Sequence, residues 1–186
     1  MVDTSRTVSD LTTNLFQDGQ AAGSITPQDL RDFVETTQVK QGSIYISSAS
    51  ATTISSSGVY VEAAGTWTLS TSPTANEFDM NTNGRLRYTG TPTVNCMFMV
   101  TTSMQMASGT TSKECGLQLH KNGTLITGST ITRLSPATNN KPGNVSTIAL
   151  ASMATNDYIS IYVANIDGTE NITVDNANLV GYSLVT

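Results

Sequence analysis

The chain has 186 residues, of which only 12% are charged, and its formal net charge is −5 with a pI near 4.6. A nucleic acid or an anionic membrane would need a basic patch, but the nine Lys and Arg residues are scattered, so neither is expected as a partner. The sequence contains 31 Thr and 21 Ser residues, and β-branched Thr suits a half-exposed sheet better than a long helix. The composition therefore predicts one mainly β domain with a polar, weakly charged surface.

No apolar run approaches the roughly 18 residues of a membrane-spanning helix, so no membrane association is expected. The N-terminal stretch MVDTSRTVSDLTT lacks the basic and apolar regions of a secretion signal, which predicts synthesis in a cytoplasm. Cys96 and Cys115 are the only cysteines and do not form a CxxC pair. A reducing compartment favours two buried free thiols, with a disulfide between them as the alternative.

Residues 1–42 differ from the rest of the chain and predict a separate N-terminal arm. Thr26 is suited to cap a helix, Pro27 suits the first helical position, and Asp29 completes a pattern that resembles a capping box. These signals predict a short helix over about residues 27–38.

The arm carries two small apolar clusters. Their members are Leu30, Phe33 and Val34 on the expected helix and Leu11, Leu15 and Phe16 upstream of it. The three helical positions fall at i, i+3 and i+4, which makes one narrow stripe. A helix this short is marginal in water on its own, so we expect these clusters to dock on another surface, such as a shell protein, a fibre base or sister subunits.

Residues 43–59 are rich in Ser and predict a linker or an edge strand that leads into the main domain. Residues 60–186 then alternate between short strand-like runs and polar turns. The dipeptide Asn122-Gly123 between two such runs is typical of a tight hairpin turn. About eight to ten short strands predict an antiparallel sandwich or barrel.

Two strand segments carry large residues on both faces. Tyr158 and Tyr162 alternate with an aliphatic row, and Met97 and Met99 flank Phe98. In a monomeric sandwich the outward row is normally Thr, Ser or Lys, whereas Met and aromatic residues are enriched at interfaces. We therefore predict that Tyr158, Tyr162, Met97 and Met99 belong to a subunit interface, the alternative being tyrosines that are simply half exposed.

No pattern in the sequence predicts catalysis or a cofactor. His120 is the only histidine, and no G-x-S-x-G motif accompanies it, which favours a surface or interface role. Cys96, Cys115 and His120 lack the spacing of a zinc site, and the DGTEN segment lacks the full pattern of a calcium loop. The acidic residues offer no distinguished pair for glycoside cleavage. We expect no enzyme activity, no metal and no cofactor.

The order of motifs from residue 60 onward resembles the tumour-necrosis-factor/C1q-like jelly roll of viral and phage structural proteins. The resemblance is carried by LRYTGTPTVNCMFMVTTSMQM, by LHKNGTLITGSTITRL and by the C-terminal run from VSTIALASM to VGYSLV. Asn156 stands where such proteins usually have Gly before the Asp of the late strand. The segment LFQDGQAAGSITPQDLRDFVETT resembles an "ITP-x-x-L-R" segment found near the start of phage virion proteins.

The resemblance implies a β-sandwich that forms a homotrimer, with the inner sheets of three jelly rolls meeting on an axis and the Tyr158/Tyr162 strand facing it. It also implies a location on the virion. The short chain favours a capsid decoration, or cement, protein on a phage head that docks on the major capsid protein or another virion protein through residues 1–42. The alternative is a head fibre or a tail tip that binds a host receptor or glycan, and a polysaccharide depolymerase is a remote third possibility.

Overall fold

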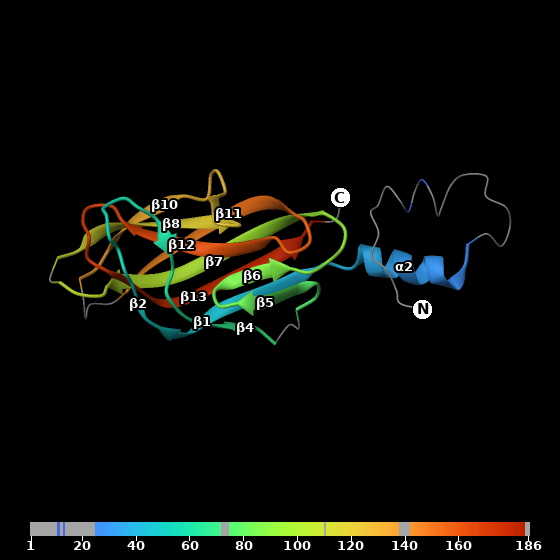
Figure 1. Ribbon diagram of the computed structural model, residues 1–186, viewed down its shortest axis with the longest axis horizontal. Helices are drawn as coiled ribbons and strands as arrows, with labels where there is room; N and C mark the ends of the chain where they lie inside the picture. Colours follow the sequence, from blue (N-terminus) through green and yellow to red (C-terminus); the bar gives the residue numbers. More distant parts are fainter. Residues whose placement is uncertain are drawn as a thin grey trace.

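The computed structural model describes residues 11, 13, 25–71, 75–109, 111–137 and 142–184. Most of this part of the chain is a sandwich of two antiparallel sheets, and one helix projects from an end of the sandwich (Figure 1). The mainly β antiparallel fold with a short helix before it, as predicted from composition and alternation, is confirmed.

The two sheets differ in strand order. Sheet A has the order β11-β7-β13-β1-β4 with β2 pairing β13, and sheet B has the order β10-β8-β12-β6-β5 with β3 and β9 at its side. Sheet A is built from β1 (Gln41–Ala49), β2 (Ala51–Thr52), β4 (Gly65–Leu69), β7 (Val94–Met106), β11 (Gly143–Met153) and β13 (Ile172–Ser183). Sheet B is built from β3 (Val61–Glu62), β5 (Phe78–Thr82), β6 (Arg85–Tyr88), β8 (Lys113–Lys121), β9 (Thr124–Leu125), β10 (Ile131–Ser135) and β12 (Tyr158–Asn165).

The core lies between the sheets and follows the two-residue period of the strands. Along β7, Cys96, Phe98 and Val100 point inward and are buried, while the residues between them point outward. Burial of one such aromatic or aliphatic side chain contributes roughly 1.5–3 kcal/mol. Along β12, every second residue from Ile159 to Val163 does the same from sheet B. The sheets are therefore held together mainly by apolar burial.

Two glycines face each other in a crowded part of the core. Gly42 of β1 lies opposite Gly181 of β13 in the ladder of sheet A. A Cβ at Gly181 would lie 2.6 Å from the Cε1 of Phe98, and a Cβ at Gly42 would overlap the side chain of Phe78. The two phenylalanine rings occupy the space that these missing side chains leave, which explains glycine at both positions.

The predicted hairpin at Asn122-Gly123 is present. Both residues have positive φ, 51° and 79°, as the tight turn between β8 and β9 requires. The Asn122 amide also donates to Asp157 Oδ1 at 2.6 Å, and its carbonyl oxygen accepts from the Tyr158 backbone N–H at 2.9 Å. The turn is thereby joined to the start of β12.

The Ser-rich segment 43–59 differs from the expected linker or edge strand. Its first part belongs to β1, which lies between β13 and β4 in the interior of sheet A. The reason is non-local pairing: Ser43 and Tyr45 face Val180 and Asn178 of the distant β13. The domain therefore includes strand residues from Gln41 onward.

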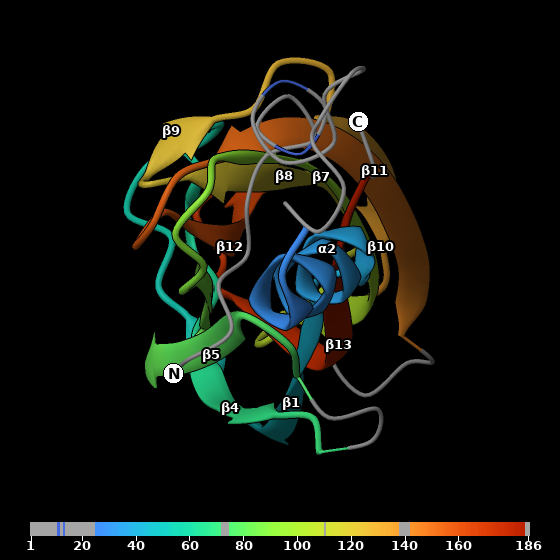
Figure 2. The same cartoon turned by 90° about the vertical axis from the view of Figure 1, so that its right-hand side faces the viewer.

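The helix α2 (Pro27–Thr37) follows the predicted bounds to within one residue. It lies beyond the end of the sandwich in the direction of the long axis (Figure 1), and the view along that axis places it in front of the sandwich near β13 (Figure 2). Among the helices in the described ranges, none is long and apolar enough to cross a membrane.

Both cysteines are buried and free, so the prediction of two free thiols is confirmed and the disulfide alternative is not. Burial raises the pKa of the Cys96 thiol to about 12. A thiol in that state is inert toward thiol-reactive reagents at neutral pH.

Candidate subunit interface and helical arm

The outer face of sheet A carries six apolar side chains in a compact block, which we call the apolar grid. Its members are Met97 and Met99 on β7, Ile148 and Leu150 on β11, and Val180 and Tyr182 on β13. The strand registers place them in two rows of three, one from each strand. Met99, Ile148 and Leu150 are 47%, 51% and 63% exposed, so this is a surface block rather than an extension of the core.

The grid occupies only one half of the face. In the next row the same three strands carry Ser146, Thr101 and Asn178, which are exposed and polar as expected for a solvated sheet. The apolar half is the one next to α2, because β1 starts and β13 ends at that side of the sheet. A contiguous exposed apolar block beside a polar one is typical of an interaction surface.

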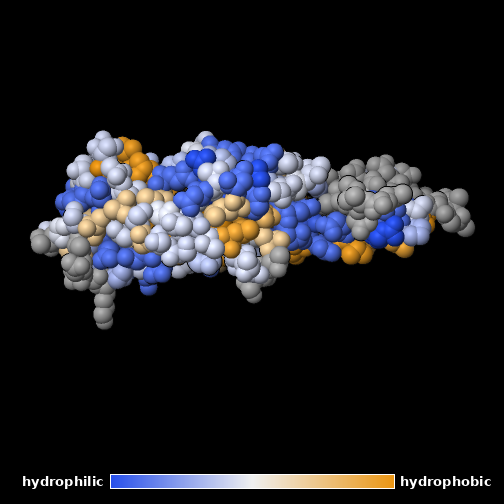
Figure 3. All heavy atoms as spheres, turned by 60° about the horizontal axis from the view of Figure 1, so that its bottom comes forward, coloured by the Kyte–Doolittle hydropathy of each residue, from blue (hydrophilic) through white to orange (hydrophobic). Residues whose placement is uncertain are grey.

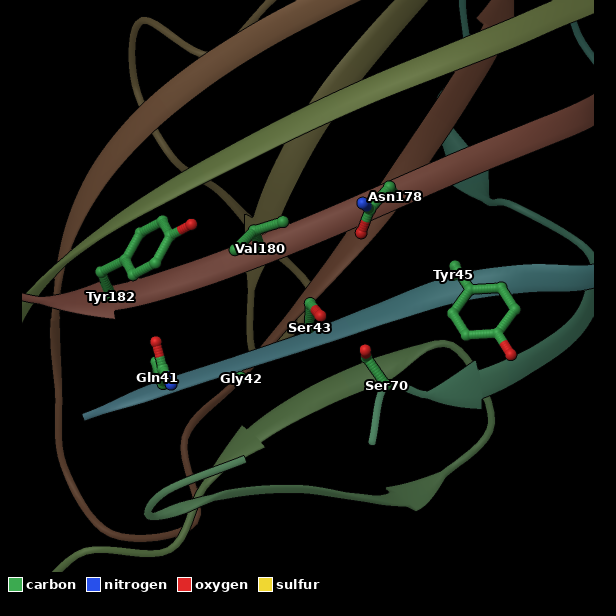
Figure 4. A pocket seen from close by; sticks show the side chains of 8 residues that line it. All are labelled: Gln41, Gly42, Ser43, Tyr45, Ser70, Asn178, Val180 and Tyr182. Carbon is green, nitrogen blue, oxygen red and sulfur yellow. The ribbon is translucent and has the colours of Figure 1, made fainter. Parts of the chain in front are cut away.

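A hollow of about 300 Å³ lies beside the grid, over β1 and β13. Small residues, including Gly42, Ser43 and Ser70, leave it open, and Tyr45 and Tyr182 stand at its two ends (Figure 4). Val180 belongs to both the grid and the lining of the hollow. The face therefore offers protruding side chains on its edge strand β11 and a receptive hollow two strands away.

The predicted interface residues lie on two different sheets. Met97 and Met99 are in the grid on sheet A, whereas Tyr158 and Tyr162 lie on the outer face of sheet B, on β12. The structure thus does not bring the two pairs together on one face. The sequence analysis did not predict the grid residues on β11 and β13, or Tyr45. A signal for the grid residues was present, because in STIALASM and NLVGYSLV some of the alternate positions that point outward are apolar.

The two tyrosine rings are already covered within the protomer. The Arg85 guanidinium lies 4.5 Å from the centre of the Tyr158 ring. The His120 ring stacks on Tyr162 with 3.7 Å between centroids and 6° between planes. Both tyrosines are half-buried as a result, and the subunit interface predicted for them stays a prediction. Such contacts with a cation or an aromatic ring are worth about 0.5–1.5 kcal/mol each.

Both ring nitrogens of His120 are in hydrogen-bond contact with neighbouring groups. Its Nδ1 is 3.0 Å from the Gly123 carbonyl oxygen, and its Nε2 is 2.8 Å from Gln118 Oε1. Gln118 in turn donates to the Thr130 hydroxyl at 3.1 Å. These contacts give His120 a structural role on the outer face of sheet B.

Ion pairs flank this network. The Arg85 guanidinium donates to both carboxylate oxygens of Glu62, at 3.0 and 2.9 Å, and this contact raises the pKa of Arg85. Arg87 makes the same two-pronged contact with Asp79 at 2.8 and 2.6 Å. In the part of the chain that the structure describes, no group of three His, Cys, Asp or Glu residues is arranged to hold a metal ion.

The helix α2 begins as predicted. The Asp29 backbone N–H donates to the Thr26 hydroxyl at 3.2 Å, and the Thr26 backbone N–H donates to Asp29 Oδ2 at 2.8 Å, which completes a capping box. Pro27 occupies the first turn, where its missing N–H costs nothing.

Lys40 joins the end of α2 to the sandwich. Its buried ammonium donates to the Glu35 carbonyl oxygen and to Glu35 Oε1, both at 2.8 Å, and lies 3.7 Å from Glu77 Oε1. Its backbone N–H donates to the Ser183 hydroxyl at 2.8 Å. A cation at the last carbonyl groups of a helix is favourable, so these contacts cap α2 and fix its direction relative to sheet A.

The apolar side of α2 is exposed. Leu30, Phe33 and Val34 are 54%, 42% and 54% exposed, and we call them the helix stripe. Figure 3 shows apolar surface along the lower border of the end of the molecule that contains α2. Asp32 is buried on another side, where it accepts a hydrogen bond from the Gln28 amide at 2.7 Å.

The upstream apolar cluster is only partly within the described residues. Leu11 is only 3% exposed, so this side chain is already buried within the protomer. Leu15 and Phe16 lie outside the described residues. The helix stripe is therefore the part of the predicted docking arm that the structure presents to solvent.

Comparison with known proteins supports the fold. No protein-family model matches the chain, and no curated protein sequence matches it. Among solved structures it is similar to the Eiger TNF of S. frugiperda, with a TM-score of 0.51 and 9% identity over 78% of this chain and 92% of that one. Murine APRIL (TM-score 0.48, 10% identity, 78% and 100% covered) and rabbit GITRL (0.42, 13%, 78% and 95%) also match.

At these identities the likeness concerns the fold alone. It agrees with the jelly roll expected from the order of motifs. The protein therefore has a TNF-like antiparallel jelly-roll domain preceded by a short helix.

Proposed function

We propose that the chain is a virion structural protein that forms a homotrimer through the outer face of sheet A and attaches to the particle through residues 1–42. The observation that carries the homotrimer is the apolar grid, because six outward apolar side chains on three adjacent strands would cost free energy if they stayed in water. The Tyr158/Tyr162 row remains a second predicted interface, with less exposed ring surface to offer.

The arrangement of the face favours a ring over a two-fold dimer. A two-fold interface needs one self-complementary patch, whereas contact between different surfaces of identical chains forms a ring where the rotation from copy to copy closes. Here the exposed Ile148 and Leu150 lie on the edge strand β11, and the hollow between Tyr45 and Tyr182 lies over β1 and β13. The side chains of one copy can enter the hollow of the next. Three copies agree with the trimer that the TNF-like resemblance implies.

The virion location rests on two features of the chain. One is the resemblance of the ITP-x-x-L-R segment to the start of phage virion proteins, and the other is the division into an N-terminal arm and a sandwich domain. We favour a decoration protein on the capsid surface, with the major capsid protein as its partner. A head fibre or tail tip is the second candidate, since a trimer built on sheet A leaves the polar and aromatic face of sheet B open to a host receptor or glycan. A depolymerase remains the remote third.

The location is tested by electron microscopy of particles from the virus that encodes the chain, labelled with a gold-conjugated antibody against the sandwich. A decoration protein gives label distributed over the head. Label confined to the tail would replace that role by the fibre or tip, and particles without label would overturn the virion proposal. Protein lacking residues 1–38 should remain trimeric but no longer bind particles.

A further inference from the structure

We infer that Glu77 is the residue of the sandwich that anchors the N-terminal arm, and that the chain keeps a strained backbone at this position because the carboxylate is needed there. Glu77 lies directly before β5, next to the residues that pair with the start of β1. The inference rests on the arm proposed above to attach to the particle, since it names the residue that holds that arm to the sandwich of its own chain.

The backbone of Glu77 lies in a region that residues with long side chains avoid. Its φ is 54°, in the left-handed region. In the described part of the chain, the other non-glycine residues with positive φ are Asn122 and Asn156. Asparagine tolerates this conformation because its short side chain bonds to the nearby backbone, and glycine adopts it without strain, but glutamate has neither advantage. Such a residue persists only where the surrounding contacts hold it in place.

The carboxylate of Glu77 joins the sandwich to the arm. Its Oε2 accepts a hydrogen bond from the Tyr88 hydroxyl of β6 at 3.2 Å, and its Oε1 lies 3.7 Å from the Lys40 ammonium. That ammonium also donates to Glu35 of α2. Tyr88 and Lys40 are 0% and 2% exposed, so water and salt screen these contacts less than they screen a surface ion pair. A chain of polar contacts thus runs from sheet B through Glu77 to the helix.

The backbone around Glu77 is fixed on both sides. Asn76 and Gln41 exchange two backbone hydrogen bonds, at 3.1 and 2.7 Å, which tie this segment to the first residue of β1. The Glu77 carbonyl oxygen accepts from the Thr89 N–H at 2.9 Å. A Cβ at Gly90 would overlap both Glu77 Oε2 and the tyrosine hydroxyl that donates to it, so glycine there leaves room for their hydrogen bond. These contacts hold the strained backbone in place.

The anchor is tested with Glu77→Ala and Glu77→Gly in the full chain. Both substitutions remove the carboxylate, but only glycine also relieves the strained backbone. The matched control is Glu62→Ala, because the Glu62 side chain is 28% exposed against 21% for Glu77 and pairs with Arg85 on the outer face of sheet B. Hydrogen exchange of the amides in residues 27–37 reports on the helix, and urea unfolding reports on the sandwich. Both are measured on the free protein, so failure of particle attachment leaves the result unaffected.

We expect exchange in α2 to rise several-fold in both Glu77 variants and to stay at the wild-type rate in Glu62→Ala. Glu77→Gly should unfold at a higher urea concentration than Glu77→Ala, because relief of strain offsets part of the loss. Unchanged α2 exchange in both Glu77 variants would overturn the anchor, as would an equal rise in Glu62→Ala or wild-type α2 amides that exchange like those of an unfolded peptide. Equal urea midpoints for the alanine and glycine variants would overturn the strain.

Discussion

Asp157 is a single residue that holds three segments together at one end of sheet B. Its carboxylate accepts from the Asn122 amide at 2.6 Å, from the Ala154 backbone N–H at 2.8 Å, and pairs with the Lys121 ammonium at 2.7 Å. Burial by itself raises the pKa of this carboxyl, but the hydrogen bonds from Lys121, Asn122 and Ala154 outweigh burial and lower the pKa below 3.8. The charged form is thus the one that stabilises the hairpin.

The lowered pKa predicts how stability depends on pH at this residue. A carboxyl with a depressed pKa in the folded state contributes stability above its unfolded pKa and loses it as the pH falls through its folded pKa. We expect Asp157→Asn to lower the free energy of unfolding by about 1 kcal/mol at pH 7, and we expect the difference from wild type to disappear as the pH falls through the lowered pKa of Asp157, below the ordinary range of a carboxyl group. Urea unfolding at several pH values measures this. A difference that is the same at pH 7 and at pH 2 would contradict it.

Tyr162 shows that the local sequence does not reveal which side chain covers an outward-pointing ring. Alternation with aliphatic residues identified its outward direction correctly, but it does not say which distant side chain covers the ring. His120 does so from β8, and it lies 42 residues before Tyr162 in the chain. The ring contact of Arg85 with Tyr158 is equally non-local. An outward aromatic row is therefore weaker evidence for an interface than an outward row whose exposure is known.

At the scale of elements, α2 and β1 are joined through Lys40. We expect Lys40→Met to keep the apolar stem but to leave Glu35 and Glu77 without their cation, which costs about 1–3 kcal/mol of unfolding free energy. Hydrogen exchange of the amides in residues 27–37 should rise more than that of β7, because the helix would lose its C-terminal cap.

The matched control for this change is Lys113→Met. Lys113 pairs with Glu170 at 3.3 Å, but the two side chains are 22% and 37% exposed, and a solvent-exposed pair of that kind contributes little to stability. Equal effects of the two substitutions, or unchanged exchange in α2 after Lys40→Met, would show that the junction does not hold the helix.

Elements with strong local signals could be predicted from the sequence. The Thr26 cap, Pro27 and Asp29 gave the start of α2, and Asn122-Gly123 gave the hairpin, because each signal acts within a few residues. The segment 43–59 could not be predicted in the same way. Its Ser-rich composition resembles that of a linker. Its first part becomes an interior strand only because it pairs with β4 on one side and with the distant β13 on the other, and the local sequence contains neither partner.

For the whole molecule, alternation gives the face on which a residue lies but not the sheet to which its strand belongs. Met97, Met99, Tyr158 and Tyr162 were therefore grouped from sequence, although β7 and β12 lie in opposite layers. The grid becomes visible only when registers bring β11, β7 and β13 side by side. The fold class was predictable from composition and turns, whereas the interface proposed on sheet A could be found only from the three-dimensional pairing of its strands.

The homotrimer through sheet A is tested most directly by sedimentation equilibrium of wild-type protein, Met99→Glu and Tyr162→Glu. Met99 is 47% exposed at the centre of the grid, so the substitution leaves the protomer fold intact but buries a charge in the proposed interface. We predict that wild type and Tyr162→Glu sediment at three times the chain mass of 19.6 kDa and that Met99→Glu sediments as a single chain. A trimeric Met99→Glu with a monomeric Tyr162→Glu, or a monomeric wild type, would contradict it.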